Sequence, residues 1–420
     1  MTTTLTVCNL PEFRAVHNVE RFHLALSNVG WCYKVVLGPL DLSRVVHVRS
    51  VLKPQDVASV IEDEVSEPFD LFDLTTPLWR IVVVRVEVDD SFFLLYTFHH
   101  AIGDGLSAMA MTEQLHEQIN IMVSGPSWMN PIQWIVPSPK DKEMPLPIDL
   151  RVNCNPSFRR CHFEKSACTL FPWPLNRLLG ARFWTGWENA NTALNLTEIT
   201  LLQSTQDETS GIMKAAKRRS ITVQSMIHAA IAFATQACFI YPLQLRGDKV
   251  EALQFFQSPV SLRGLIPSKI DRYEQGNFVS ELPYMVSIKP VTSFWSVAAD
   301  YHKALTKATK TKPGIQVLCE RLGLLKFMSL RGGAWENAMI QSLRKAYNGR
   351  FASTRVSNIG RGWFSSLTLE KQPYEVADAV FSQSACPPGS AFTIYITTAG
   401  GIMTITASCQ RSTPNGRERN

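Results

Sequence analysis

Two adjacent histidines are the clearest chemical feature of the chain. Residues 98–107 read FHHAIGDGLS, in which His99 and His100 are followed by Asp104 between two glycines. Imidazole binds transition metals and also serves as a general base, because its unperturbed pKa is about 6.5. The segment therefore allows three interpretations: a metal site, a catalytic base with its support, or a strand end that carries two structural histidines.

Strand geometry disfavours the metal site. Neighbouring side chains on a regular strand point to opposite faces, so His99 and His100 cannot both address one centre. No third ligand follows at a usable spacing, and His116-Glu117 lacks the second histidine of the HExxH zinc motif. We therefore expect no metal ion here. One histidine should face an open cleft, and the other should face the core or a neighbouring layer.

The residues after the histidines suit a turn into a helix. Asp104 stands where the helix would begin, and a carboxylate there accepts backbone N–H bonds and favours the positive end of the helix dipole. Gly105 has no side chain, so a ligand or another backbone can come close. A structural role is thus favoured for Asp104 over a catalytic one.

The elements around this segment are predicted from periodicity. The β-branched run 78–88, the turn Asp89-Asp90 and the run 92–98 indicate a hairpin of two buried strands, and 106–123 indicates a helix. Further strands are predicted at 44–52, 194–202, 253–262, 278–288, 352–356, 391–398 and 402–409, and further helices from Pro54 and at 211–218, 222–245, 294–310 and 316–328. This mixed order is typical of an α/β or α+β enzyme with two layered domains.

The spacing of the histidine segment resembles a known signature. His99-His100-Ala101-Ile102-Gly103-Asp104-Gly105 matches the HHxxxDG motif of the chloramphenicol-acetyltransferase-like superfamily. That superfamily includes peptide-synthetase condensation domains, plant BAHD acyltransferases, mycobacterial polyketide-associated acyltransferases and fungal alcohol O-acetyltransferases. Other segments resemble it too: PFDL at 68–71, PLWR at 77–80, SITVQ and HAA within 220–230, SLR at 261–263 with GN at 276–277, and SNIG at 357–360. The SNIG segment resembles the alcohol acetyltransferase branch, and the DFGWG motif of the plant branch does not occur.

The resemblance implies two similar domains, each a mixed β-sheet with flanking helices, with an active-site tunnel between them. We place the N-terminal domain at residues 1–185, the C-terminal domain at 186–410 and a polar tail at 411–420. The length of 420 residues suits two domains of roughly 200 residues each.

The resemblance also implies acyl transfer from a thioester to a hydroxyl or amine. His100 would be the general base, and Asp104 would point away from the substrate and pair with an arginine, for which Arg263 is the best match. The chemistry is coherent from the residues as well. A thioester is already activated, so no nucleophilic serine or cysteine is needed, and the sequence contains no GxSxG motif.

Four further residues are assigned around this base. His99 is expected to support packing, and Gly105 to keep the loop open. Asn358 is the candidate donor to the oxyanion of the tetrahedral intermediate, with a turn asparagine as the alternative. Asn277, which follows Gly276, is expected to be a turn residue.

The leading functional hypothesis is an O-acyltransferase that acts without a covalent intermediate. It would move an acyl group, expected to be acetyl, from acyl-CoA as co-substrate to a hydroxyl of a small secondary metabolite, as a monomer with no bound cofactor. One alternative is a free-standing condensation-type enzyme that takes its acyl group from an acyl carrier protein. A second is a non-catalytic small-molecule binder, since a fold alone does not prove activity.

Composition limits the remaining classes. With 45% hydrophobic and 19% charged residues the chain is an ordinary folded protein, and a net charge of +6 without basic–aromatic runs does not indicate nucleic acid. The nine cysteines form no CxxC pair, so neither a disulfide framework nor a zinc knuckle is expected.

The apolar stretch 220–245 contains Gln224, His228 and Pro242, which favours a core helix over a membrane span. Because MTTTLTVCNLPEF lacks signal features, we expect a cytoplasmic protein.

Overall fold

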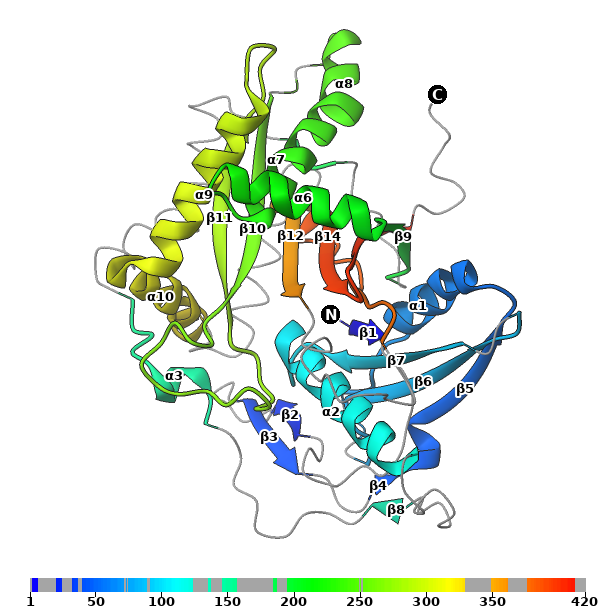
Figure 1. Ribbon diagram of the computed structural model, residues 1–420. Coiled ribbons are helices and arrows are strands. Elements are labelled where there is room, and N and C mark those ends of the chain that lie inside the picture. The colour runs from blue at the N-terminus through cyan, green and yellow to red at the C-terminus, as the bar shows by residue number, and fades with distance from the viewer. Residues whose placement is uncertain are drawn as a thin grey trace.

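The computed structural model describes residues 2–6, 20–24, 32–36, 40–71, 73, 75–88, 91–123, 135–136, 146–156, 184–186, 195–248, 250, 252–328, 349–361 and 376–411. Two large β-sheets organise these residues, and each carries helices (Figure 1). The expected α/β architecture of mixed sheets with flanking helices is confirmed.

The smaller of these sheets holds the histidine segment. Its five strands lie in the order β13 (Val380–Gln383), β1 (Thr2–Thr6), β7 (Phe92–His99), β6 (Trp79–Val86) and β5 (Val46–Val51). Strands β6 and β7 form the predicted antiparallel hairpin, whereas β5 runs parallel to β6. Helix α1 (Val57–Ser66) contributes to one apolar cluster on this sheet and α2 (Gly105–Val123) to another. Histidines at the end of β7 are thus held by a sheet packed on both faces.

The larger sheet is built by the C-terminal half. Its six strands lie in the order β11 (Val279–Ser287), β10 (Leu253–Ser261), β12 (Ala352–Arg361), β14 (Ser390–Ala399), β15 (Ile402–Gln410) and β9 (Thr197–Gln203). Its helices are α6 (Gln206–Arg218), α7 (Val223–Thr235), α9 (Phe294–Lys310) and α10 (Lys312–Met328). Burial alternates strictly along β10, and Phe256 of that strand packs in one apolar cluster with Ala229 and Ala232 of α7 and Ala298 of α9.

Strand β13 joins the two halves. It lies between β12 and β14 in the chain but pairs antiparallel with β1 in the N-terminal sheet. Its Phe381 is buried in the same cluster as Phe98 of β7 and Tyr395 of β14. Neither β1 nor β13 is predicted from the sequence, and their pairing places the HHxxxDG segment beside the C-terminal half.

Short elements complete the described chain. They are the pairs β2 (Glu20–Leu24) with β3 (Cys32–Val36) and β4 (Leu40–Asp41) with β8 (Ile135–Val136), the 3-10 turns η2 (Leu42–Arg44) and η3 (Pro54–Asp56), and helix α3 (Ile148–Arg151). Of the predicted tail 411–420, only Arg411 lies within the described residues.

The long apolar helix starts in the core and ends at the surface. Helix α7 continues through the π-helical turn η6 (Gln236–Ile240) into α8 (Tyr241–Leu245). By length and composition alone Val223–Leu245 could cross a membrane, and 33% of its most apolar window is buried inside the protein. The predicted core helix is thus buried against the C-terminal sheet only over its first half, since Tyr241 and Leu245 are exposed.

Candidate active site

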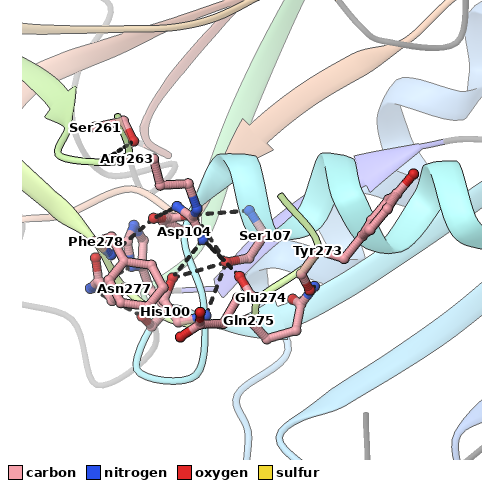
Figure 2. A network of polar contacts seen from close by, with 11 residues as sticks. His100, Asp104, Ser107, Ser261, Arg263, Tyr273, Glu274, Gln275, Asn277 and Phe278 are labelled. Atoms are coloured by element: carbon pink, nitrogen blue, oxygen red, sulfur yellow. Dashed lines mark hydrogen bonds and ion pairs between the residues drawn. The ribbon is translucent and has the colours of Figure 1, made fainter. Parts of the chain in front are cut away.

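The catalytic candidate His100 lies in the turn between β7 and α2. Strand β7 ends at His99, and α2 begins at Gly105. A segment of the C-terminal half, residues 262–278 between β10 and β11, meets this turn, and the two are joined by a network of polar contacts (Figure 2). The site is therefore built from both halves of the molecule.

Asp104 is fully buried and hydrogen-bonded through both carboxylate oxygens. Its Oδ1 accepts from the backbone N–H of Ser107 at 2.8 Å and lies 3.0 Å from the Ser107 hydroxyl. Its Oδ2 accepts from Arg263 Nη1 at 2.5 Å and from the backbone N–H of Phe278 at 3.0 Å. Asp104 thus caps the start of α2 and binds the C-terminal segment, so the expected ion pair with Arg263 is present.

Arg263 spans several acceptors at once. Its Nη2 donates to Ser107 Oγ at 3.0 Å and to the carbonyl of Glu274 at 3.0 Å. The guanidinium carbon lies 4.6 Å from the centre of the Phe278 ring, within cation–π range. Because only 9% of this side chain is exposed, the pair with Asp104 is shielded from solvent.

Ser107 and Asn277 are site residues that sequence reasoning missed. Ser107 Oγ lies 2.9 Å from the carbonyl oxygen of Gly276 and accepts from the backbone N–H of Gly276 at 3.1 Å. Asn277 was expected to be a turn residue, yet its Nδ2 lies 3.3 Å from His100 Nδ1 and 3.4 Å from the His100 carbonyl oxygen. Both contacts span more than 150 positions in the chain, so no local pattern indicates them.

Burial sets the protonation of His100. The ring lies partly buried, which lowers its pKa from the ordinary value, while a bond to the backbone carbonyl of His100 itself and the charge of Asp104 act in the opposite direction. Burial therefore favours the neutral ring of His100, which is the charge state that a general base requires.

His99 has different surroundings. Its Nδ1 accepts a hydrogen bond from the backbone N–H of Ala101 at 3.3 Å, and its ring meets Phe69 edge to face at 6.4 Å. Burial lowers the pKa of His99 to about 4, so the ring is neutral at ordinary pH. These contacts fit the packing role that the sequence suggests.

Gly105 allows two strands of the C-terminal half to approach α2. A Cβ atom at this position would lie 2.7 Å from Ile359 Cγ2 and 3.2 Å from the Phe381 ring. Ile359 belongs to a bulge in β12, between Asn358 and Gly360. Close approach at Gly105 is thus a structural requirement, filled here by protein side chains.

The oxyanion candidate Asn358 takes part in the same bulge. Its Oδ1 accepts from the backbone N–H of Gly360 at 2.8 Å, and Gly360 has a φ of 81°. This is the local contact of a turn asparagine, which leaves only the amide nitrogen of Asn358 for an oxyanion. A donor role for Asn358 stays a prediction.

Arg355 places a positive charge near His100. It pairs with Glu281 at 2.6 Å on β11, and its Nη2 lies 3.4 Å from Gln257 Oε1 on β10. By register Arg355 is opposite Thr393, and Ser357 is opposite Tyr395, which packs against Phe381. These residues thus share the sheet face that looks toward the N-terminal half, and the Arg355 charge lowers the pKa of His100.

Metal ligands do not gather in the described part of the chain. No group of three or more His, Cys, Asp or Glu side chains among the described residues has the arrangement of a metal site. The described site therefore offers a partly buried histidine, a buried ion pair and a second cation.

Comparison with solved structures agrees with the fold. Among solved structures the fold resembles polyketide synthase associated protein 5 from Mycobacterium tuberculosis, with a TM-score of 0.57, 16% identity and coverage of 98% of this chain and 90% of that one. It also resembles the first condensation domain of the CDA synthetase, with a TM-score of 0.56, 13% identity and coverage of 99% and 86%.

Sequence comparison gives the family. The probable alcohol acetyltransferase crmB of Aspergillus fumigatus is 32% identical over 71 residues, which are 16% of this chain and 15% of that protein. The alcohol acetyltransferase family model matches residues 55–420, which include the histidine turn, Arg263 and the SNIG segment. The chain therefore belongs to the alcohol acetyltransferase family.

Proposed function

We propose that the protein transfers an acyl group, acetyl in the first instance, from acyl-CoA to a hydroxyl of a small metabolite, with His100 as general base. The observation that carries the proposal is the state of His100. It stands in a turn that the Asp104–Arg263 pair joins to the C-terminal half, and burial lowers its pKa, which favours the neutral ring. Membership of the alcohol acetyltransferase family supports a hydroxyl as acceptor.

The proposed reaction is a single addition followed by an elimination. The acceptor oxygen attacks the thioester carbonyl carbon while His100 Nε2 takes the hydroxyl proton, which forms a tetrahedral oxyanion. The C–S bond then breaks, and the thiolate receives the same proton as it leaves as CoA-SH. General-base assistance contributes about a hundred- to ten-thousandfold to such a step, and holding the two substrates together contributes much of the rest.

A basic pocket supports a CoA ester as donor. A cavity of about 1090 Å³ is lined by α6, the residues before α7, the end of β12 and the Gly400-Gly401 turn. Lys214, Lys217 and Arg361 contribute three cationic side chains to its wall, which suits the phosphates of CoA. Arg361 lies two residues beyond Ile359, whose side chain faces Gly105 at the start of α2. The thioester end of an acyl-CoA that lies along β12 would thus point toward the histidine turn.

The test of the base uses a matched pair of histidine variants. The protein is incubated with a panel of acyl-CoAs and an extract of hydroxylated metabolites, and products are identified by mass spectrometry. His100→Ala should abolish acyl transfer, whereas His47→Ala, on the exposed edge strand β5, should not. Full turnover by a folded His100→Ala protein would refute the assignment.

The test of the donor separates CoA from a carrier protein. Lys217→Glu should raise the KM for acetyl-CoA but not for acetyl-pantetheine, which lacks the nucleotide and 3′-phosphate. Consumption of an acyl-loaded carrier protein with none of acetyl-CoA would favour a condensation-type reaction. Binding of an alcohol without any thioester consumption would identify a binding protein that keeps the fold.

A further inference from the structure

We propose that Arg355 and Glu281 determine the specificity for the acceptor, and that the acceptor carries a second, uncharged polar group at the end remote from the hydroxyl that is acylated. In this arrangement the reactive hydroxyl lies at His100, and the remote group lies at the Arg355–Glu281 pair. The inference rests on the proposed function and names the class of its acceptor. Its first test needs no turnover.

The ion pair lies on the face of the C-terminal sheet that is turned away from the helices. Phe256 of β10 packs with α7 and α9, so its neighbour Gln257 points to the opposite face. Ser280 of β11 donates to a carbonyl of α10, so Glu281 points the same way as Gln257. Nη2 of Arg355 lies 3.4 Å from Gln257 Oε1 and 2.6 Å from Glu281 Oε1. The pair therefore spans the central strand of β11, β10 and β12 (Figure 1).

Both strands that carry the pair lead to the histidine turn. On β12, Ile359 lies four residues beyond the arginine of the pair, and its Cγ2 lies 2.7 Å from the place of a Cβ atom at Gly105. Ahead of β11, Asn277 lies four residues before the glutamate, and its Nδ2 lies 3.3 Å from His100 Nδ1 (Figure 2). Because a strand rises about 3.3 Å per residue, the pair lies about 13 Å from the turn along β12. A small metabolite can span that separation.

The proposed CoA pocket and the ion pair lie in opposite directions from this turn. Arg361, which lines the pocket, is two residues beyond Ile359 on β12, whereas Arg355 is four residues before it. A strand is extended, so these three residues follow one another along one line. A thioester that reaches the turn from the Arg361 end thus leaves the Arg355 end for the acceptor.

The pair retains polar atoms for a ligand. Its one ion-pair contact joins Arg355 Nη2 to Glu281 Oε1. Nη1 of the arginine and Oε2 of the glutamate have no polar contact within the part of the chain that the structure describes. The two side chains are 17% and 37% exposed, so the pair is reachable from solvent. A hydroxyl, which both donates and accepts, matches this combination of donor and acceptor.

Charge balance argues for an uncharged group on the acceptor. An arginine without a partner selects a carboxylate or phosphate, to which its guanidinium donates two parallel hydrogen bonds. Here Glu281 balances the charge of Arg355 and repels an anion, and Arg355 in turn repels a cation. The pair therefore suits a hydroxyl, keto or amide group.

Binding of three linear alcohols to the full chain tests this class without turnover. 1,9-Nonanediol has a hydroxyl at each end, 1-nonanol lacks the second one, and 9-hydroxynonanoic acid has a carboxylate there instead. NMR titration should give the diol a Kd about fivefold below those of the other two, the factor expected for one neutral hydrogen bond. Equal Kd values for the diol and 1-nonanol, or tightest binding of the acid, would overturn the proposal.

Substitutions test the two charges separately. Glu281→Gln leaves the arginine unbalanced, so the preference should turn from the diol to the acid. Arg355→Gln removes the donor and leaves the glutamate, so the diol should lose its advantage and the acid should bind worst. Arg49→Gln is the matched control, because Arg49 pairs with Asp63 at 3.2 Å on the edge strand β5, and it should keep the wild-type order. The symmetry of the diol cancels in a comparison between variants.

An ion pair that only held the strands together would give a different result. Its loss would lower the Tm measured by circular dichroism and leave the order of the three Kd values unchanged. That result in Glu281→Gln would overturn the proposal.

Turnover separates this inference from the proposed function. With acetyl-CoA as donor, kcat/KM of the wild type should follow the same order as the affinities. Acetyl transfer without preference for the diol would overturn the acceptor class and keep the proposed function. No consumption of any acyl-CoA with these alcohols or with the metabolite extract would refute the proposed function, and the Kd values would still decide the role of the ion pair.

Discussion

Asp104 and His100 differ most in what surrounds them. Asp104 is buried, and its carboxylate is engaged by a backbone N–H and a side chain on each oxygen, so it has no capacity left for a reacting group. His100, in contrast, has a side-chain contact at Nδ1 and none at Nε2 among the residues that the structure describes. Within the HHxxxDG signature, Asp104 thus builds the turn, as the sequence suggested on capping grounds, and His100 is the residue that we propose as the base.

The pKa of His100 is lowered from its ordinary value near 6.5, first by burial and also by the Arg355 charge. A base works only while neutral, so its rate falls as pH drops through its pKa. Because that pKa is depressed, the acid limb of kcat/KM should lie below pH 6.5. Arg355 also pairs with Glu281, which makes it a fixed charge at this site.

Arg355→Gln should move the acid limb toward higher pH. Removal of the positive charge lets the imidazolium form more readily, so the base is lost at a higher pH than in the wild type. The measurement is kcat/KM between pH 5 and 9. Lys303→Gln removes the same charge from the exposed face of α9, where 76% of the side chain is accessible, and should leave the profile unchanged. An acid limb that moves downward, or equally in both variants, would contradict the argument.

At the scale of elements, periodicity predicts most of the sheets. The β6–β7 hairpin and α2 appear where β-branched runs and helical spacing put them. Helix α6 begins at Gln206, earlier than the predicted start at residue 211, because Thr205 and Glu208 form a capping box ahead of that range. Strand β13 is four residues long and buried throughout, so its sequence shows neither the alternation of apolar and polar residues nor the length that would predict a strand.

The site itself was predictable in part. The histidine turn is local in sequence and carries a specific motif. The Arg263 partner followed only from family resemblance, since 159 positions separate it from Asp104. Asn277 and Ser107 became site residues through the packing of one loop on one helix start, which a single sequence does not encode as a pattern.

Gly105→Ala tests the close approach of elements at α2. The added methyl would lie 2.7 Å from Ile359 Cγ2 and 3.2 Å from the Phe381 ring, so these packed side chains must shift. We expect the free energy of unfolding to fall by about 1–3 kcal/mol, as in overpacked cores. The measurement is urea denaturation.

Gly211→Ala is the control for this change. Gly211 lies within α6, and a Cβ atom there would meet nothing within 4 Å, so alanine should stabilise the protein by about 0.5–1 kcal/mol. Adding Ile359→Ala to Gly105→Ala should recover part of the lost stability, because it removes the nearest clashing atom. Equal effects of the two glycine substitutions would show that space at Gly105 is not limiting.

At the scale of the molecule, the C-terminal half contributes one strand to the N-terminal sheet, and side chains of each half contact the other. Strand β13 leaves the C-terminal half to pair with β1, and the hydroxyl of Thr406 on β15 donates to the carbonyl of Phe381. Strand β9 of the C-terminal sheet contacts the N-terminal half, since the backbone N–H of Ile199 donates to Glu62 of α1 at 2.7 Å. With Asp104 and Arg263, these contacts tie the halves together at several places around the histidine turn.

We therefore expect the two halves to unfold as one cooperative unit. Phe381 is 2% exposed and meets Tyr395 edge to face at 5.2 Å, so Phe381→Ala removes packing from both sheets at once. It should lower stability by about 3–5 kcal/mol while differential scanning calorimetry still records a single transition at a lower Tm. Val291→Ala, at a side chain that is 93% exposed, should leave Tm unchanged. Two resolved transitions, of which only one shifts in Phe381→Ala, would mean that β13 does not couple the unfolding of the two halves. His100 and Arg263 would then belong to halves that unfold separately.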